Sequence, residues 1–353
     1  MAALYVAIGH MATMVDPLRK MWLPENHPLL LSQLTKPLWF GHLAVAAFIV
    51  LSGFSLQLAL FKRSEQGDFS GFVPYLRRRA RRILPPYYAC LLFSILICLG
   101  VTQHQPGLPF TQYVPLTIDN VVAHLFLVHN FHPAWMYKIN GVLWSIAIEA
   151  QLYIAFPLLV AIRARLGVLS QLAVAAVVVW AAFLVIPSAP KLYFWYLWLF
   201  ALGGCAAWWA KARGLGKVPA NLVGLVSLVL LGFGCLTAQQ AKSVILPDLL
   251  FGTGTAVLLV ALTATPQWTL NKILGCRPLY WLGGFSYSLY LMHHPLLQAL
   301  FVYRPSAVKT PLEQFAYLLA CSPLILGACY LFHLAFERPF MGAPKLKSVA
   351  PTA

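Results

Sequence analysis

Residues 39–61 read WFGHLAVAAFIVLSGFSLQLALF and contain no lysine, arginine, aspartate or glutamate. A helix needs about 20 predominantly apolar residues to cross the ~30 Å hydrocarbon core of a bilayer, so this run is long enough to span one. Comparable apolar runs occur on both sides of it. We place the predicted spans at about 1–14, 39–61, 83–101, 142–162, 169–186, 192–210, 218–238, 246–263, 285–302 and 311–336. The sequence therefore predicts an all-α, polytopic transmembrane bundle of about ten spans.

The composition agrees with lipid as the main solvent for this chain of 353 residues. Hydrophobic residues make up 60% of it and charged residues only 10%, whereas soluble domains carry about a quarter charged residues. The net charge of +16 would suit nucleic acid, but the cations lie in short clusters between apolar runs, where membrane topology places them. Such clusters favour anionic lipid headgroups, so we exclude nucleic acid. The seven cysteines show no metal-ligand or disulfide spacing.

The distribution of lysine and arginine orients the predicted bundle. With the N-terminus in the cytoplasm, 17 cations fall in inside segments and 8 in outside segments, which together are the 25 of the chain. This bias predicts that both termini are cytoplasmic and that the protein is a multi-pass protein of the cell inner membrane. We expect one transmembrane domain over residues 1–340 and a short basic cytoplasmic tail over 341–353.

The first apolar run is short. Fourteen residues cover about 21 Å at 1.5 Å per residue, which is less than the thickness of the hydrocarbon core. Either the first helix is tilted beside thinned lipid, or the native protein starts several residues upstream of Met1. Mass spectrometry of the native N-terminus would distinguish the two, and a native start at Met1 would exclude the second.

One acid lies well inside a predicted span. Glu149 is part of LWSIAIEAQLY, residues 143–153, in which Ser145, Glu149 and Tyr153 recur every four residues. One helix face therefore carries a hydroxyl, a carboxylate and a phenol. A protonated structural glutamate is the alternative, but ionisable groups in lipid usually face a cavity or a partner, so we favour a functional role.

Two histidine-bearing helices supply further candidates. His10 lies on the first predicted span, where a neutral imidazole can accept a proton from a hydroxyl; a histidine hydrogen-bonded within the bundle is the alternative. Ser286, Tyr290 and His293 share one face of the 285–302 run, as either a structural polar seam or a substrate-lining face. The histidines of the 102–140 loop lack the spacing of a helical metal site, so no metal is predicted.

The densest basic run is Arg77-Arg78-Arg79-Ala80-Arg81-Arg82. It serves in part as a positive-inside anchor. Five guanidiniums within six residues also form a site for phosphates, because arginine binds them bidentately. Coenzyme A would present a pyrophosphate and a ribose phosphate on the same, cytoplasmic, side.

At these residues the sequence resembles the acyltransferase-3 family of integral membrane acyltransferases, over nearly the whole chain and in the family's order. The matching segments are Ala2-Ala3-Leu4 through His10, Phe48 through Phe54 with its Ser52-Gly53 pair, Arg78-Arg79 through Arg82-Ile83 with Pro85 and Tyr87, Trp144-Ser145 with Glu149, Gln151 and Tyr153, Ser286 through Leu291 with His293 and Pro295, and Glu337-Arg338-Pro339-Phe340. Two positions differ from the family: its first-helix arginine would fall before Met1, and Ala150 stands in the second position of its usual acidic pair.

The resemblance implies a membrane O-acyltransferase that moves an acyl group, often acetyl, from acyl-CoA to a hydroxyl of a sugar, polysaccharide, lipid-linked glycan or secondary metabolite. Acyl-CoA is then a co-substrate, and no tightly bound cofactor is expected. We assign His10 as the general base, with Glu149 orienting or balancing its imidazolium. We expect the CoA phosphates to bind Arg78, Arg79 and Arg82. The residues expected to line the channel or the substrate site are Ser52, Gly53, Trp144, Ser145, Tyr153, Ser286, Tyr290 and His293.

Two other readings remain open from the sequence. A membrane exporter or transporter of a glycan, lipid or small molecule would also have many spans and intramembrane ionisable groups, but no inverted repeat or paired interrupted helices are visible. An inactive membrane scaffold requires that the first-helix arginine is truly lost. Nothing in the sequence identifies the acceptor or the acyl chain length.

Overall fold

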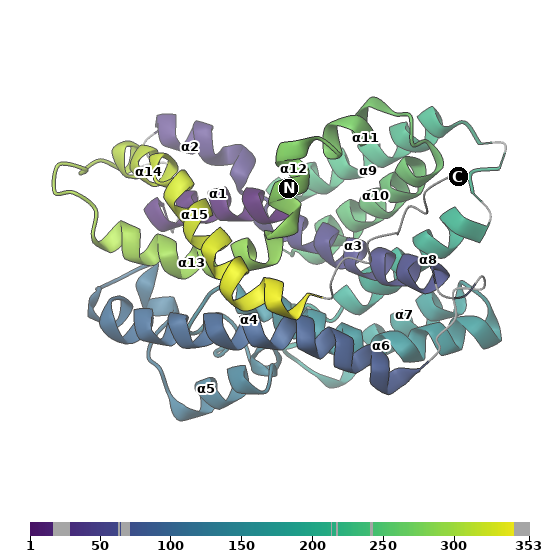
Figure 1. The fold of residues 1–353 in the computed structure, drawn as a ribbon, viewed down its shortest axis with the longest axis horizontal. Coiled ribbons are helices and arrows are strands. Elements are labelled where there is room, and N and C mark those ends of the chain that lie inside the picture. Colours follow the sequence, from purple (N-terminus) through teal and green to yellow (C-terminus); the bar gives the residue numbers. More distant parts are fainter. Residues whose placement is uncertain are drawn as a thin grey trace, which may run out of the picture.

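The protein is described here from a computed structural model, which describes residues 1–16, 29–62, 64, 71–212, 214–216, 218–240 and 243–341. Within these residues the chain is helical and contains no strand, which confirms the all-α prediction. Figure 1 shows α1 and α13–α15 in one half of the molecule and α8–α10 in the other. The predicted basic tail lies outside the described residues, apart from Met341.

Each of the ten predicted apolar segments contains a helix. These helices are α1 (Ala2–Val15), α3 (Gly41–Phe61), α4 (Phe72–Gly100), α6 (Leu143–Leu166), α7 (Ser170–Val185), α8 (Tyr196–Ala212), α9 (Ala220–Gln240), α10 (Ile245–Ala264), α13 (Ser286–Val302) and the pair α14 (Pro311–Ala320) and α15 (Ser322–Phe332). Four short helices lie between them: α2 (Leu29–Thr35), α5 (Ile118–Leu125), α11 (Thr269–Leu274) and α12 (Arg277–Gly284).

Fewer helices than predicted are long and apolar enough to cross a membrane. Among the described residues five helices meet this condition, namely α3, α4, α6, α9 and α10. A sixth candidate is the pair α14 and α15, which is bent by 44° at its break. Helices α1 and α7 are apolar but have only 14 and 16 residues, and α8 and α13 have 17 each. The count of ten spans is therefore not confirmed.

Helix α4 begins well before the predicted span at 83–101, because the arginine run is itself helical. Arginine is a good helix former, so residues 77–82 can extend the helix beyond the apolar segment. The 29 residues of α4 cover about 43 Å, which exceeds the ~30 Å core, so its basic turns can project beyond the hydrocarbon. Pro85 and Pro86 lie inside this helix. In a membrane bundle the neighbouring helices can compensate for such prolines.

Helices α3 and α8 approach each other closely at two glycines. A Cβ atom on Gly53 would lie 2.1 Å from the Phe200 carbonyl oxygen, and one on Gly203 would lie 2.0 Å from the Val50 carbonyl oxygen. Both distances are far inside van der Waals contact, so only glycine allows this separation. Small residues that let two backbones meet are a common way to pack helices in lipid.

Helix α13 is held on the opposite side by contacts with α1, α4 and α15. Its first turn is fixed by Glu337, whose Oε2 accepts hydrogen bonds from the Ser288 hydroxyl at 2.5 Å and the Ser288 amide at 3.3 Å. The same oxygen lies 2.8 Å from Nδ1 of His333. The Glu337-Arg338-Pro339-Phe340 motif thus places a carboxylate that anchors α13, the helix that carries His293.

Candidate active site

Two neighbouring cavities contain most of the residues predicted for the site. The first, of about 570 Å³, is lined by Arg79, Arg82 and Glu149 and is called the carboxylate cavity. The second, of about 270 Å³, is lined by His10 and is called the histidine cavity. The two walls share Val6, Val45 and Tyr290. Arg79, Arg82 and the predicted base therefore line adjoining cavities. Glu149 lies on the arginine side and not beside His10, whose partner is His293, so the predicted pairing of Glu149 with the His10 imidazolium is wrong.

In the carboxylate cavity Glu149 is 4% exposed and belongs to a compact hydroxyl–carboxylate group. Its Oε1 accepts hydrogen bonds from the Ser52 hydroxyl at 3.1 Å and from the Tyr153 hydroxyl. The Ser52 and Tyr153 hydroxyl oxygens are 3.0 Å apart. The i, i+4 spacing on α6 explains why Glu149 and Tyr153 meet, and α3 supplies the serine. A buried carboxylate is stabilised by such donors.

The arginines at this cavity come from the basic turns of α4. Arg79 places its guanidinium carbon 5.6 Å from the centre of the Tyr153 ring and 5.8 Å from that of Tyr75, within the range of cation–π contacts. Arg82 is three residues further and so faces the same way. Arg78 is exposed and does not line the cavity. Of the three predicted donor-binding arginines, two line the cavity, the half-buried Arg79 and the exposed Arg82.

In the histidine cavity His10 is held by a second imidazole. Nδ1 of His10 lies 2.8 Å from Nε2 of His293, and the two rings are stacked with an interplanar angle of 7°. Nδ1 of His293 lies 2.9 Å from the Leu289 carbonyl oxygen, which can only accept. A neutral His293 therefore accepts at Nε2, and His10 donates from Nδ1. In neutral His10 the basic nitrogen is then Nε2.

Sequence reasoning missed His294, which lines the histidine cavity next to His10. Its Nε2 lies 3.1 Å from the Tyr113 hydroxyl, and its Nδ1 lies 3.3 Å from the Gln298 amide nitrogen. Gln298 in turn accepts a hydrogen bond from the Thr102 hydroxyl at 3.0 Å. The pair His293-His294 was visible in the sequence, whereas Tyr113 lies in a loop whose fold no periodicity predicts.

No pattern in the sequence singles out His42 and Asp248. His42 lines the histidine cavity, and its Nε2 is 3.8 Å from Oδ1 of Asp248. Asp248 is fully buried, and its Oδ2 accepts a hydrogen bond from the Trp195 indole at 3.0 Å. Asp248 lies near the start of α10, where an acid is usually exposed in a loop. The sequence alone does not show whether neighbouring helices bury such a helix end.

Tyr290 separates the two cavities. Its hydroxyl oxygen is 2.7 Å from that of Ser145, and its ring lies parallel to that of Phe48 with centroids 6.4 Å apart. The His293 ring is edge-on to it at 6.0 Å. The predicted Ser145 and Tyr290 are thus brought together. Tyr290 forms the partition between the space beside Glu149 and the space beside His10.

The remaining predicted residues fall into three places. Trp144 lines the histidine cavity and stacks on Tyr193 with ring centroids 4.3 Å apart. Ser286 lines the carboxylate cavity and donates to the Gly283 carbonyl at 2.9 Å. Ser145 and His293, which were also predicted to line the site, line neither cavity and instead contact Tyr290 and His10. Gly53 also lines neither cavity, in contrast to the prediction. It follows Ser52 by one residue, about 100° around the helix, and so turns to α8 instead of the cavity.

A comparison with known proteins agrees with the motifs that this geometry brings together. The model of the acyltransferase-3 family, described as an acyltransferase domain, matches residues 1–334. The chain belongs to the acyltransferase-3 family. The resemblance noted in the sequence is thereby confirmed.

Curated relatives match about three quarters of the chain. One is the peptidoglycan O-acetyltransferase OatA of Listeria monocytogenes, 26% identical over 294 residues, which are 73% of this chain and 45% of the relative. The putative peptidoglycan O-acetyltransferase YrhL of Bacillus subtilis is 28% identical over 73% of this chain and 44% of its own length. The O-acetyltransferase OatA of Staphylococcus aureus is 25% identical over 73% and 46%. The chain thus spans less than half the length of these relatives. No solved structure matches.

Proposed function

We propose that this protein is a membrane O-acyltransferase that moves an acetyl group from acetyl-CoA to a hydroxyl of a glycan. The observation that carries the proposal is the adjoining pair of cavities, one with arginines and one with a histidine base, that share Tyr290 as a wall. Family membership supports acyl transfer, and the names of the relatives support acetyl as the group and a peptidoglycan-type glycan as the acceptor.

The donor is placed in the carboxylate cavity. Arg79 and Arg82 bind the CoA phosphates, with the exposed Arg78 at the entrance, because guanidiniums pair bidentately with phosphate oxygens. The pantetheine arm then runs along the cavity toward Tyr290. Glu149, held by Ser52 and Tyr153, serves this cavity by keeping Arg79 in position over the Tyr153 ring.

The acceptor is placed in the histidine cavity, where three histidines and six aromatic side chains form the wall. Nε2 of His10 takes the proton of the acceptor hydroxyl as its oxygen bonds to the acyl carbon. The carbon–sulfur bond breaks, and the CoA thiolate leaves and takes up the proton from His10. His293 keeps the His10 ring in the orientation and tautomer that this step requires.

Purified protein in lipid nanodiscs, incubated with acetyl-CoA and soluble peptidoglycan fragments, tests the proposal. We expect release of CoA thiol that depends on the fragments, and acetyl esters on the fragments by mass spectrometry. Full activity of His10→Ala would refute the assignment of the base. Transport of labelled fragments into sealed vesicles, without consumption of acetyl-CoA, would instead favour the exporter.

The membrane arrangement is a second part of the proposal. The arginine end of α4 and both termini lie on the cytoplasmic side of the inner membrane. The chain crosses this membrane about ten times, and the short helices are tilted or, like α14 and α15, joined as a pair in one span. Cys276 is exposed and lies on the predicted inner side, between α11 and α12. A membrane-impermeant maleimide should label it only in inverted vesicles, whereas a cysteine introduced by Lys309→Cys should react only in right-side-out ones. The opposite labelling pattern would overturn this orientation.

A further inference from the structure

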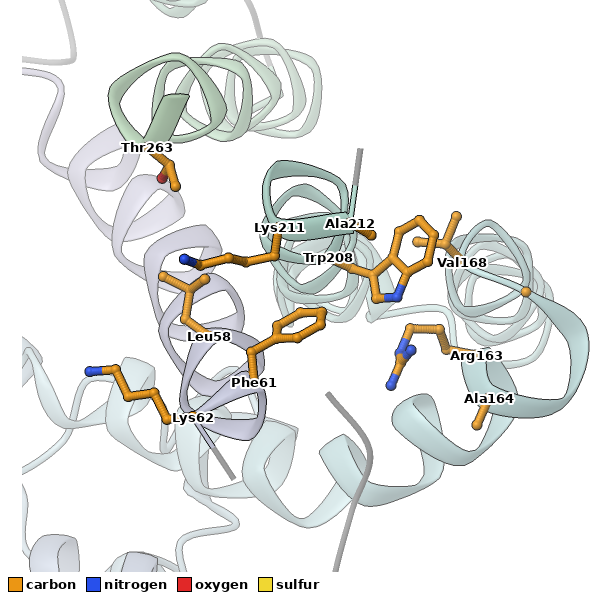
Figure 2. A pocket seen from close by; sticks show the side chains of 11 residues that line it. Leu58, Phe61, Lys62, Arg163, Ala164, Val168, Trp208, Lys211, Ala212 and Thr263 are labelled. Carbon is orange, nitrogen blue, oxygen red and sulfur yellow. The ribbon is translucent and has the colours of Figure 1, made fainter. Parts of the chain in front are cut away.

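The two ends of α6 place different side chains at cavities. At its C-terminal end Arg163 lines a third cavity, of about 830 Å³, together with Lys62 and Lys211. Figure 2 shows these cations around that cavity, which contains none of the residues assigned to acyl transfer. At the N-terminal end of α6, Trp144 lines the histidine cavity. Residues 144–163 cover about 28 Å of helix, so the two cavities lie toward opposite faces of the membrane.

Aromatic rings surround the N-terminal end of α6. The Trp144 ring stacks on that of Tyr193, from the loop before α8, with the centroids 4.3 Å apart. Tyr137, from the loop before α6, lies edge-on to Trp144 at 6.3 Å, and its hydroxyl oxygen is 3.3 Å from that of Tyr193. All three side chains line the histidine cavity, and together they are called the aromatic subsite.

The backbone around both tyrosines is strained. Tyr193 has a φ of +57°, in the left-handed region that a bulky residue rarely adopts. Ile139, two residues after Tyr137, has a φ of +65°, and its amide donates a hydrogen bond to the Tyr113 carbonyl oxygen at 3.0 Å. Such conformations are unfavourable, persist only where the surrounding structure imposes them, and are concentrated at ligand-binding and active sites. This strain is a reason to place a ligand at the two tyrosines.

Aromatic side chains near a membrane surface often have another role, which is to anchor helices among the lipid headgroups. Tyrosines with that role face the lipid. Tyr137 is 37% exposed, but its side chain also lines the cavity that contains the proposed base His10. Trp144 is only 7% exposed and so is largely shielded from lipid. The aromatic subsite thus presents its rings to the same space as the base.

We propose that the aromatic subsite binds the acceptor as a sugar ring, which packs its C–H face on the Tyr137 ring. Rings with a few hydroxyls suit a pyranose, because a pyranose has an apolar C–H face and a rim of hydroxyls. The Tyr137 and Tyr193 hydroxyls exchange hydrogen bonds with that rim, and Trp144 supports Tyr193 by stacking. This role rests on the proposed function and adds the residues that select the acceptor, because a linear alcohol has no flat apolar face.

Acceptor kinetics of the full chain in lipid nanodiscs, at saturating acetyl-CoA and varied concentrations of soluble peptidoglycan fragments, test the subsite. Tyr137→Ala should raise the KM for the fragments by about fivefold, the factor that one favourable aromatic contact contributes to affinity. Its KM for acetyl-CoA should stay at the wild-type value. Tyr137→Phe keeps the ring and should recover most of the affinity. The matched control Tyr303→Ala removes an exposed ring that does not line the cavity, and should behave like the wild type.

Isothermal titration calorimetry of the fragments, without acetyl-CoA, separates failure of the subsite from failure of the proposed function. We expect the same loss of about fivefold in Tyr137→Ala, whether or not transfer occurs. Wild-type affinity and acceptor KM in both Tyr137→Ala and Tyr193→Ala would overturn the subsite, and so would a wild type that binds no fragment. A matching rise in the KM for acetyl-CoA would show that Tyr137 only supports the fold. Fragment binding that depends on Tyr137, without any acetyl transfer, would keep the subsite and overturn the proposed reaction.

Discussion

The carboxylate cavity and the histidine cavity adjoin, yet they are built in different ways. In the first, Ser52, Glu149 and Tyr153 come from two helices and bond directly to one another, with Arg79 packed on top. In the second, His10 depends on His293 of α13, and its neighbour His294 depends on Tyr113 of a loop. The polar groups of the carboxylate cavity are thus held by α3, α4 and α6, which carry the family motifs. The histidine cavity is assembled from more distant parts of the chain.

The two constructions match the two requirements of the proposed reaction, which are binding of the donor and removal of a proton from the acceptor. Binding a polyanionic donor needs fixed charges, which arginines near a buried carboxylate provide. Abstracting a proton needs a neutral base in a defined tautomer, which the hydrogen-bonded pair His10 and His293 provides without adding charge. Tyr290 separates the carboxylate cavity from the histidine cavity and lines both of them.

The largest expected effect is on the base. His10→Ala should lower the rate of acetyl transfer by about 10³-fold, since general-base catalysis contributes about 10²–10⁴-fold. Binding of acetyl-CoA, measured by isothermal titration calorimetry, should remain, because His10 does not line the donor cavity. His132→Ala, which changes an exposed loop histidine, is the control. Loss of donor binding in His10→Ala would break the distinction between the cavities.

The next effect concerns the donor. Arg79→Gln/Arg82→Gln should raise the KM for acetyl-CoA by about 10²-fold with a much smaller change in kcat, because each charge-assisted hydrogen bond contributes about 1.5–3 kcal/mol. Steady-state kinetics at varied acetyl-CoA concentration measure it. Arg81→Gln removes an exposed arginine that does not line the cavity, and its KM should stay at the wild-type value. An equal effect in Arg81→Gln would mean that the run acts only as a diffuse anchor.

The partition should determine which acyl groups pass. Tyr290→Ala removes the ring that stacks on Phe48 and should raise the ratio of butyryl-CoA to acetyl-CoA turnover by about tenfold, since pocket size discriminates by about 1–3 kcal/mol per methylene. Competition between the two donors, analysed by mass spectrometry of the products, measures the ratio. Tyr290→Phe keeps the ring and loses the Ser145 contact, and should retain the acetyl preference. A wild-type ratio in Tyr290→Ala would contradict the partition.

The smallest effect is expected at the loop that supports the histidine cavity. Tyr113→Phe removes the hydroxyl beside His294 and should lower kcat by about fivefold, the value of one hydrogen bond of about 1 kcal/mol. The KM for acetyl-CoA should not change. Tyr303→Phe, which removes an exposed hydroxyl after α13, should have no effect. A raised donor KM in Tyr113→Phe would show that the two cavities are not independent.

The sequence predicted the helical segments well and the site in part. Apolar runs identify helices because the side chains of each run must lie either inside the bundle or in lipid. The four-residue spacing correctly predicted that Glu149 and Tyr153 lie together. Spacing does not tell which helices become neighbours. The contact between His10 and His293 joins residues 283 positions apart, and the buried state of Asp248 depends on helices that cover it. Gly53 shows the same limit, because its face turns to α8.

The close backbone approach at Gly53 and Gly203 prevents α3 from sliding along α8, because a carbonyl group of the other helix lies directly against each glycine. Ser52 belongs to α3, whereas His10 meets α13 through the contact of its ring with that of His293. Solubilisation should therefore loosen the first helix before the rest of the bundle. Preparations in harsh detergent are expected to keep their circular dichroism and still lose turnover, and mild amphiphiles or nanodiscs are the better choice for assays.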